Sequence, residues 1–163
     1  MIKKFMKKVM AVALAGALTV GMGVTAMASA TDPGYDVGLT QSSGAAIPHD
    51  NPMTGADVEY EYDEDGNVMS TSITVYTDEI SYMGATGYIS ALNIVLDDGS
   101  EVEGVAVDGT GVTYPVAFEF ELDGAYETLS FDVGYTVAIV MGSTIHRSTT
   151  GIMTLTAAAS AAA

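Results

Sequence analysis

One short acidic segment, residues 60–68, has the spacing of calcium ligands. Glu61, Asp63 and Asp65 alternate along it and are followed by a glycine, which matches the first half of an EF-hand loop. The second half does not match, because Ser72 stands where a bidentate glutamate is needed. An Asp-Gly pair between two alternating segments is also a strong hairpin signal. The segment therefore predicts a hairpin turn, with a calcium loop as the alternative.

Several other acidic turns offer a weaker, cooperative form of the calcium hypothesis. If turns from different strands met at one end of a sheet, their carboxylates would form an oxygen-rich site. The candidate metal ligands are Asp63, Asp65, Asp97 and Asp98. The competing interpretation is a solvated acidic rim, since a high net charge alone accounts for the acids.

Nitrogen-bearing titratable side chains are scarce beyond residue 30. Two histidines occur, His49 and His146, and Arg147 is the single cation of that part of the chain. Arg147 is interpreted either as one partner of an ordinary ion pair or as a planar clamp for a ligand carboxylate. A hydrolytic triad needs a nucleophile, a base and an acid in mutual reach, and no Gly-x-Ser-x-Gly segment supports Ser143 with His146. We therefore expect no enzymatic activity.

Thioether and phenol side chains are plentiful, with ten methionines and nine tyrosines in the 163 residues. Methionine at a strand position usually fills a core, although it can also ligate a metal or contact a ligand. Haem or another small ligand captured by Met, Tyr and His is therefore one alternative function. No cofactor is expected, with haem or calcium as the alternatives. The candidate ligand-binding residues are Tyr82, Met83, Met141, His146 and Arg147.

In size, predicted export and strand content, the chain resembles the secreted haem-capturing sandwiches known as NEAT modules. The resemblance implies a β-sandwich that uses tyrosine or methionine as an iron ligand. Its tyrosine-ligating members carry two tyrosines four residues apart late in the chain, whereas Tyr126 and Tyr135 are nine apart here. The likeness therefore covers architecture only.

The elements that must position these side chains are β-strands. Apolar and polar residues alternate with period two along most of residues 57–156, for example in Val116–Leu122 and Met69–Val75. Four Asp-Gly pairs punctuate the alternation: Asp65-Gly66, Asp98-Gly99, Asp108-Gly109 and Asp123-Gly124. The pattern predicts an antiparallel, immunoglobulin-like β-sandwich of seven or eight strands, with a small β-barrel as the alternative.

The composition divides the chain into four predicted segments. Residues 1–30 carry all four lysines, an apolar run and Ala28-Ser29-Ala30, as expected of a cleaved signal peptide. Residues 31–55 are rich in Pro, Gly and Ser and predict an irregular leader, with a short edge strand at Tyr35–Leu39 as an option. The sandwich is expected at 56–156, and a disordered Ala-rich tail at 157–163. No membrane span is expected after cleavage.

Charge and cysteine content exclude several function classes. After residue 30 the chain carries 21 acidic residues and one arginine, a formal charge of about −20, so nucleic-acid binding is excluded. The absence of cysteine excludes disulfides and thiolate chemistry. These properties predict a secreted or cell-surface-associated, non-enzymatic binding module. Its expected partner is a protein or glycan surface, or a second copy of the chain, and the alternatives are haem or small-ligand capture and a calcium-stabilised module.

Overall fold

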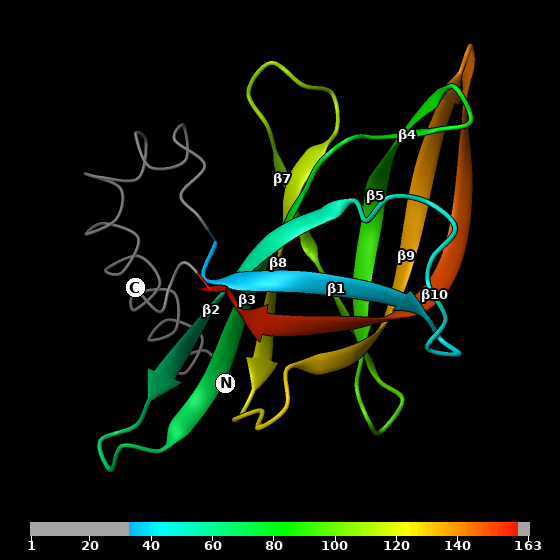
Figure 1. Ribbon diagram of the computed structural model, residues 1–163. Coiled ribbons are helices and arrows are strands. Elements are labelled where there is room, and N and C mark those ends of the chain that lie inside the picture. The colour runs from blue at the N-terminus through cyan, green and yellow to red at the C-terminus, as the bar shows by residue number, and fades with distance from the viewer. Residues whose placement is uncertain (1–32, 160–163) are drawn as a thin grey trace. The chain divides into compact units, whose positions relative to one another are not determined.

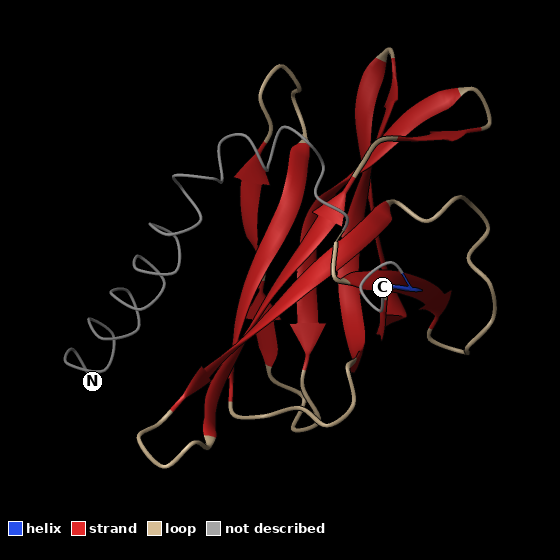
Figure 2. Cartoon of the chain, turned by 60° about the vertical axis from the view of Figure 1, so that its left-hand side comes forward, coloured by secondary structure: helices blue, strands red, loops and turns tan. Residues whose placement is uncertain are grey.

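The computed structural model describes residues 33–159, so the predicted signal peptide and the last residues of the predicted tail lie outside the described residues. The described chain consists of antiparallel β-strands and has no α-helix (Figures 1 and 2). The strands are β1 (Tyr35–Gln41), β2 (Met53–Tyr62), β3 (Val68–Thr77), β4 (Ile80–Tyr82), β5 (Ala85–Val95), β6 (Glu101–Glu103), β7 (Val105–Asp108), β8 (Pro115–Asp123), β9 (Ser130–Met141) and β10 (Ser143–Ala157). The all-β, antiparallel prediction is confirmed, with ten strands rather than seven or eight.

The strands form one continuous sheet that is not closed into a barrel. Its order is β4-β5-β9-β10-β1-β2-β3-β8-β7, and the short β6 pairs with β5 outside this path. The sheet folds over so that side chains of β5 and β9 share a core with those of β3 and β8, an arrangement consistent with a β-sandwich. Within residues 33–159, no helix has the length and apolar character needed to cross a membrane.

Alternation along each strand builds the core. In β8, Phe118, Phe120 and Leu122 are buried while Glu119 and Glu121 are exposed. Each fully buried side chain of this kind contributes roughly 1.5–3 kcal/mol relative to exposure. The core includes Leu39, Ile73, Val75, Ile89, Leu92, Ile94, Phe118, Phe120, Leu122, Phe131, Val133 and Met153.

Residues 35–41 differ from the sequence interpretation, which placed them in an irregular leader with at most a short edge strand. They form β1, which pairs with β10 from Tyr35↔Ala157 to Gln41↔Gly151 and touches β2 at Tyr35↔Ala56. The strand is thus internal. Its Pro-rich and Gly-rich flanks explain the difference, because they belong to the segments before it and to the loop at residues 42–52, which joins β1 to β2.

β9 and β10 pair with each other from Met141↔Ser143 to Ser130↔Thr154 and form a two-stranded ribbon at one side of the sheet (Figure 1). β10 bonds to β1 only through residues 151–157, so residues 143–150 have β9 as their single partner. Every residue from 141 to 150 is accordingly exposed. The outer half of β9 also pairs with the start of β5, so the ribbon is one side of a four-stranded wing made of β4, β5, β9 and β10.

Candidate functional site

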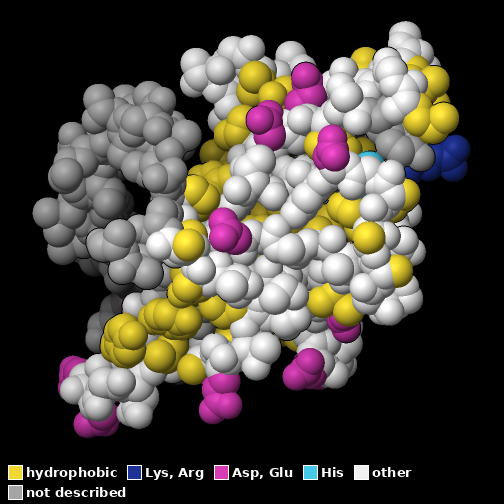
Figure 3. All heavy atoms as spheres, viewed as in Figure 1, with side chains coloured by type: hydrophobic (Ala, Val, Ile, Leu, Met, Phe, Trp, Pro, Cys, Tyr) yellow, Lys and Arg dark blue, Asp and Glu magenta, His cyan; other side chains and the backbone are white. Residues whose placement is uncertain are grey.

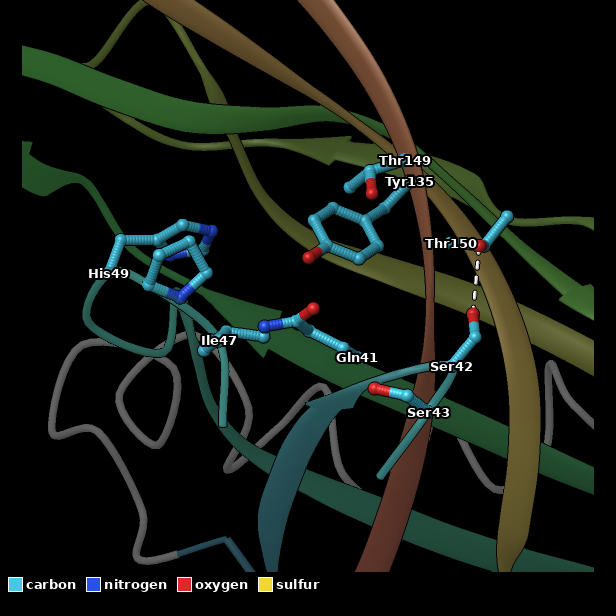
Figure 4. A pocket seen from close by; sticks show the side chains of 9 residues that line it. Gln41, Ser42, Ser43, Ile47, His49, Tyr135, Thr149 and Thr150 are labelled. Carbon is cyan, nitrogen blue, oxygen red and sulfur yellow. Dashed lines mark hydrogen bonds between the residues drawn. The ribbon is translucent and has the colours of Figure 1, made fainter. Parts of the chain in front are cut away.

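A cavity of about 430 Å³ lies between the β1–β2 loop and the β9–β10 ribbon (Figure 4). We call it the loop cavity; it is lined by Gln41, Ser42, Ser43, Ile47, Pro48, His49, Tyr135, Thr149 and Thr150. A smaller space of about 170 Å³, the apolar cavity, is lined by Pro48, His49, Ile80, Gly87, Val137, Ile139, Arg147 and Thr149. Since Pro48, His49 and Thr149 line both, the two cavities adjoin and form a single candidate site.

Hydrogen bonds hold the β1–β2 loop over the ribbon. The side-chain amide of Gln41 donates to the Ala46 carbonyl at 2.7 Å. The Ser42 and Thr150 hydroxyls are 2.8 Å apart and tie the start of the loop directly to β10 (Figure 4). At the other end, the Asn51 side-chain amide donates to the Val37 carbonyl at 2.7 Å. The roof of the loop cavity is therefore anchored at both ends.

Tyr135 contributes a buried phenol with an unused hydroxyl. The residue is 4% exposed, and Figure 4 shows its hydroxyl directed toward the space between Gln41 and His49. The hydroxyl forms no hydrogen bond with any of residues 33–159. No fully buried side-chain oxygen or nitrogen in that range lacks a partner, so this hydroxyl opens into the cavity. Burial raises the pKa of Tyr135, which keeps the phenol neutral and able to donate.

A glycine in β10 allows β1 to approach and lies beside the Tyr135 ring. A Cβ atom added at Gly151 would lie 2.5 Å from the Thr40 carbonyl oxygen, and 3.5 Å from Cε1 of Tyr135, which is an ordinary contact. The first distance is too short for any real Cβ contact, so β1 approaches β10 closely only because residue 151 has no side chain. Gly151 thus permits the strand pairing that brings the roof to the ribbon.

His49 lies at the boundary of the loop cavity and the apolar cavity. Its Nδ1 is 2.7 Å from the backbone carbonyl oxygen of Asp50. A carbonyl only accepts, so Nδ1 is the donor in this contact. The loop therefore supplies a half-buried imidazole whose ring is held by its own backbone.

The pairing register decides which ribbon side chains face the cavities. Residues directly opposite in an antiparallel pair share a face, and the register pairs Tyr135 with Thr149 and Val137 with Arg147. All four of these residues line the two cavities. His146 follows the opposite phase of the strand and lies on the other face.

Arg147 is the only lysine or arginine among the described residues. It is exposed, borders the apolar cavity and forms no ion pair with any of residues 33–159. Neither cavity has an aspartate or glutamate in its lining, although the chain has 21 of them. The candidate site is therefore an acid-free region that includes the single described cation.

The sequence-predicted ligand residues do not gather around one point. Tyr82 ends β4, and its backbone pairs with Ala85. Met83 occupies the turn before β5 with φ 50° and is 90% exposed, while Met141 ends β9 and is 64% exposed. Of the predicted set, only Arg147 is in the lining of the loop cavity or the apolar cavity.

His146 contacts Ser90 and is not in the lining of the loop cavity or the apolar cavity. Its Nδ1 lies 3.5 Å from the hydroxyl oxygen of Ser90, which also donates to the Thr136 carbonyl at 3.3 Å. Within residues 33–159, no carboxylate accepts a hydrogen bond from His146. The pair stands on the face of the wing opposite the candidate site.

Sequence reasoning did not single out Gln41, His49, Tyr135 or Thr149 as site residues. His49 fell in the predicted irregular leader, and the alternation around Tyr135 indicated a core side chain. The sequence alone could have separated Arg147 from His146. Adjacent residues of a strand point to opposite faces, so these two side chains cannot belong to one site.

The predicted metal ligands lie in two separate hairpin turns. Asp63, between β2 and β3, accepts the backbone N–H groups of Asp65 and Asn67 at 2.9 and 2.8 Å. Hydrogen bonds from Asn67 lower the pKa of Asp63. Asp98, between β5 and β6, accepts from the Ser100 backbone at 2.8 Å, and bonds from Ser100 lower its pKa. No group of three or more His, Asp or Glu side chains in the described part of the chain is placed to hold a metal ion.

A third cavity, of about 770 Å³, has the opposite electrostatic character. Asp97, Asp98, Glu127 and Asp132 are in its lining, and we call it the acidic cavity. Tyr126 also lines it, and the pKa of Tyr126 is raised first by burial and then by neighbouring acids that include Asp97 and Asp98. Two of the four sequence-predicted metal ligands are therefore here.

The candidate site combines a buried phenol, an imidazole held by a backbone carbonyl and a guanidinium without an ion-pair partner among residues 33–159, next to apolar walls. Comparisons with family models, with curated proteins and with solved structures find no match for this chain.

Proposed function

We propose that the protein is a secreted, non-enzymatic binding module that captures a small ligand in the loop cavity and the adjoining apolar cavity. The observation that carries this proposal is the Tyr135 hydroxyl, which opens into the loop cavity without a hydrogen-bond partner among the described residues. Small-ligand sites combine mostly apolar walls with a few convergent polar groups, in volumes of roughly 300–1,000 Å³. The loop cavity, at about 430 Å³, lies within that range.

The side chains at this site favour recognition over bond-making. Tyr135 supplies a neutral donor, Thr149 supplies a hydroxyl beside it on the ribbon, and His49 supplies polar atoms from the loop. A ligand acceptor that meets the Tyr135 hydroxyl replaces its solvent contact with a direct hydrogen bond, which contributes about 1 kcal/mol. Secretion enters the proposal through the lysine-rich, apolar start of the sequence.

A second candidate function, contact with a protein or glycan surface, is favoured by a separate observation. Apolar side chains gather over the outer parts of β2 and β3 (Figure 3). Tyr62 is 58% exposed and Met69 41% exposed, and the rings of Tyr60 and Tyr62 are 6.5 Å apart. Exposed amphipathic rings of this kind suit macromolecular contacts. A Tyr62→Ser variant that retains all binding to cell-wall glycans and to host-surface proteins would remove this candidate.

The small-ligand proposal is tested with 1-octanol, a neutral probe with one hydroxyl and an aliphatic chain. Titration followed by methyl NMR should give saturable shifts of Ile80, Val137 and Ile139, which line the apolar cavity. Tyr135→Phe should weaken binding by about fivefold, because one hydrogen bond of about 1 kcal/mol is lost. The matched control is Tyr126→Phe at the acidic cavity, which should leave the affinity unchanged.

Two results would contradict the proposal. One is the absence of saturable shifts at these methyl groups up to the solubility limit of 1-octanol. The other is equal loss of affinity in Tyr135→Phe and Tyr126→Phe, which would place the probe elsewhere or indicate a general loss of structure.

A further inference from the structure

The charges around the candidate site indicate the charge of its ligand. Acidic side chains are distributed over the described surface, yet none lines the loop cavity or the apolar cavity. Arg147, the one described cation, borders the apolar cavity and has no ion-pair partner in residues 33–159. Arg147 is therefore the one permanently charged side chain in the lining of the two cavities.

An apolar track continues from the cavity along the wing. Val137, Ile139 and Met141 alternate on one face of β9, and the register places Ile145 of β10 opposite Ile139. Exposure rises along the track, from 9% at Val137 to 64% at Met141. The track therefore begins in the apolar cavity and ends at the open tip of the ribbon, where apolar side chains lack a covering partner among the described residues.

A glycine makes this track a groove rather than a flat face. Gly87 of β5 is paired with Ile139, and its missing side chain leaves space between Ile80 and Val137. A Cβ atom added at Gly87 would contact Val137 Cγ1 at 3.4 Å and Ile80 Cγ1 at 3.6 Å. The space beside Gly87 is thus bounded by Val137 and Ile80, and an alanine side chain fits into it at van der Waals distance.

The spacing of the polar groups sets where an anionic head would bind. Arg147 is opposite Val137, and Tyr135 is two residues farther along β9, or about 7 Å. A carboxylate between them would accept from the guanidinium fork and from the neutral Tyr135 phenol. From Val137 to Met141 the track spans about 14 Å, which suits an aliphatic tail of about eight to twelve carbons.

From this arrangement we infer that the ligand is an aliphatic carboxylate, whose head is held by Arg147 and Tyr135 and whose tail lies along Val137, Ile139 and Met141. This inference rests on the proposed function and adds the chemical class of the ligand. Aliphatic walls and the lack of acidic lining support this class over a cation or a sugar. The other occupant of such a track would be the same face of a second copy of the chain.

The test compares octanoate with 1-octanol, which share the aliphatic chain and differ in the head group. In the wild-type protein, calorimetry should show octanoate binding about tenfold more tightly, the contribution of a charge-assisted hydrogen bond. In Arg147→Gln, octanoate should bind about as tightly as 1-octanol, and the affinity for 1-octanol should be unchanged. The matched control is His146→Gln, the adjacent residue on the opposite face, which should preserve the preference.

A third variant tests the tail. Gly87→Ala should weaken both probes to a similar extent, by about fivefold or more, because the added methyl group occupies the groove without changing any charge. Its unfolding midpoint should equal or exceed that of the wild type, since the new contacts are of ordinary length and alanine stabilises a strand relative to glycine.

The possible failures are distinguishable. If 1-octanol binds and octanoate binds no more tightly, the carboxylate inference is overturned while the proposed function stands. If neither probe binds, both are overturned. If sedimentation shows a dimer that Met141→Ser disperses and octanoate does not, the second-copy occupant replaces the carboxylate.

Discussion

The loop cavity and the acidic cavity each contain one tyrosine, but they differ in what surrounds it. Tyr135 stands among Gln41, His49 and Thr149 without an acid in the lining, and burial alone raises its pKa. Tyr126 stands beside Asp97 and Asp98, and both burial and these acids raise its pKa. Burial is therefore the first cause of the shift in both tyrosines, and acids add to it only at Tyr126.

The difference shows how a strongly acidic chain can separate two kinds of site. Acids in the β5–β6 turn and the segment before β9 give one cavity a negative potential. The wing lines the apolar cavity with side chains that include Arg147 and no acid. Because the large charge is spread unevenly, local composition rather than net charge decides which ligands each cavity admits.

The largest expected effect comes from adding a side chain at Gly151. Gly151→Ala should lower the free energy of unfolding by about 2–3 kcal/mol, because its Cβ would overlap the Thr40 carbonyl oxygen. The resulting shift of β1 should also move Gln41 and Ser42, which line the loop cavity, and so weaken 1-octanol binding there. Urea denaturation and the octanol titration measure the two effects.

Gly134→Ala is the matched control for that change. Gly134 pairs with Thr150 in the same ribbon, and a Cβ atom there would have no atom within 4 Å. We expect stability equal to the wild type or up to about 1 kcal/mol higher. Equal destabilisation by the two substitutions would show that the ribbon rejects any side chain and that Gly151 has no special part in forming the cavity.

A smaller effect, but one that separates the cavities directly, is the salt dependence of the two tyrosine pKa values. High salt should bring the pKa of Tyr126 back toward its ordinary value of 10.0, because salt screens the carboxylates that raise it. The pKa of Tyr135 should stay raised, because burial is its only cause. Tyrosine absorbance titrations of Tyr126→Phe and Tyr135→Phe at low and high salt measure this. If salt changed the pKa values of Tyr126 and Tyr135 equally, the proposed electrostatic difference between the two cavities would be wrong.

The same raised pKa values predict how stability changes with pH. Well below pH 10 both tyrosines are neutral in the folded and in the unfolded chain. They therefore contribute no pH dependence to the free energy of unfolding in that range. Above pH 10 the unfolded tyrosines release protons before the folded ones, so the unfolded state binds fewer protons and the free energy of unfolding falls. Tyr135→Phe should make that fall less steep, as followed by urea denaturation between pH 9 and 11.

Calcium should produce the smallest effect. The Asp63 and Asp98 carboxylates already accept backbone N–H groups of their own turns, and Asp63 and Asp65 lie in a different hairpin from Asp97 and Asp98. We expect a melting temperature unchanged within about 1 °C at millimolar calcium. A rise of several degrees that Asp98→Asn cancels would establish the acidic cavity as a calcium site, since a ligand that binds only the folded form stabilises it.

The strands were predictable from the sequence because burial follows a period of two. Phe118, Phe120 and Leu122 alternate with glutamates, and that pattern alone places them in the core. β1 was harder to predict, because its own alternation is short and prolines and glycines surround it. Its place became clear only through pairing with β10, a contact between distant parts of the chain.

The candidate site was less predictable for the same reason. Tyr135 and His49 share a cavity only because β1 lies beside β10 and the following loop folds back over the ribbon. No local pattern encodes that register. Arg147 was found because it is chemically unique in its surroundings, whereas Met83 and Met141 were selected by residue type and stand at exposed turns and strand ends.

Pairing of the first described strand with the last also determines when the binding site forms. Ser42 and Thr150, whose hydroxyls tie the roof to the ribbon, are 108 positions apart in sequence. Joining such distant segments costs loop-closure entropy before any contact repays it, so topologies of this kind fold slowly, in about milliseconds to seconds. A chain that lacks its last strand would have neither a roof tether nor the strand that pairs with Tyr135. Ligand uptake would therefore begin only after folding of the whole domain, and the bound fraction would serve as a measure of completed maturation.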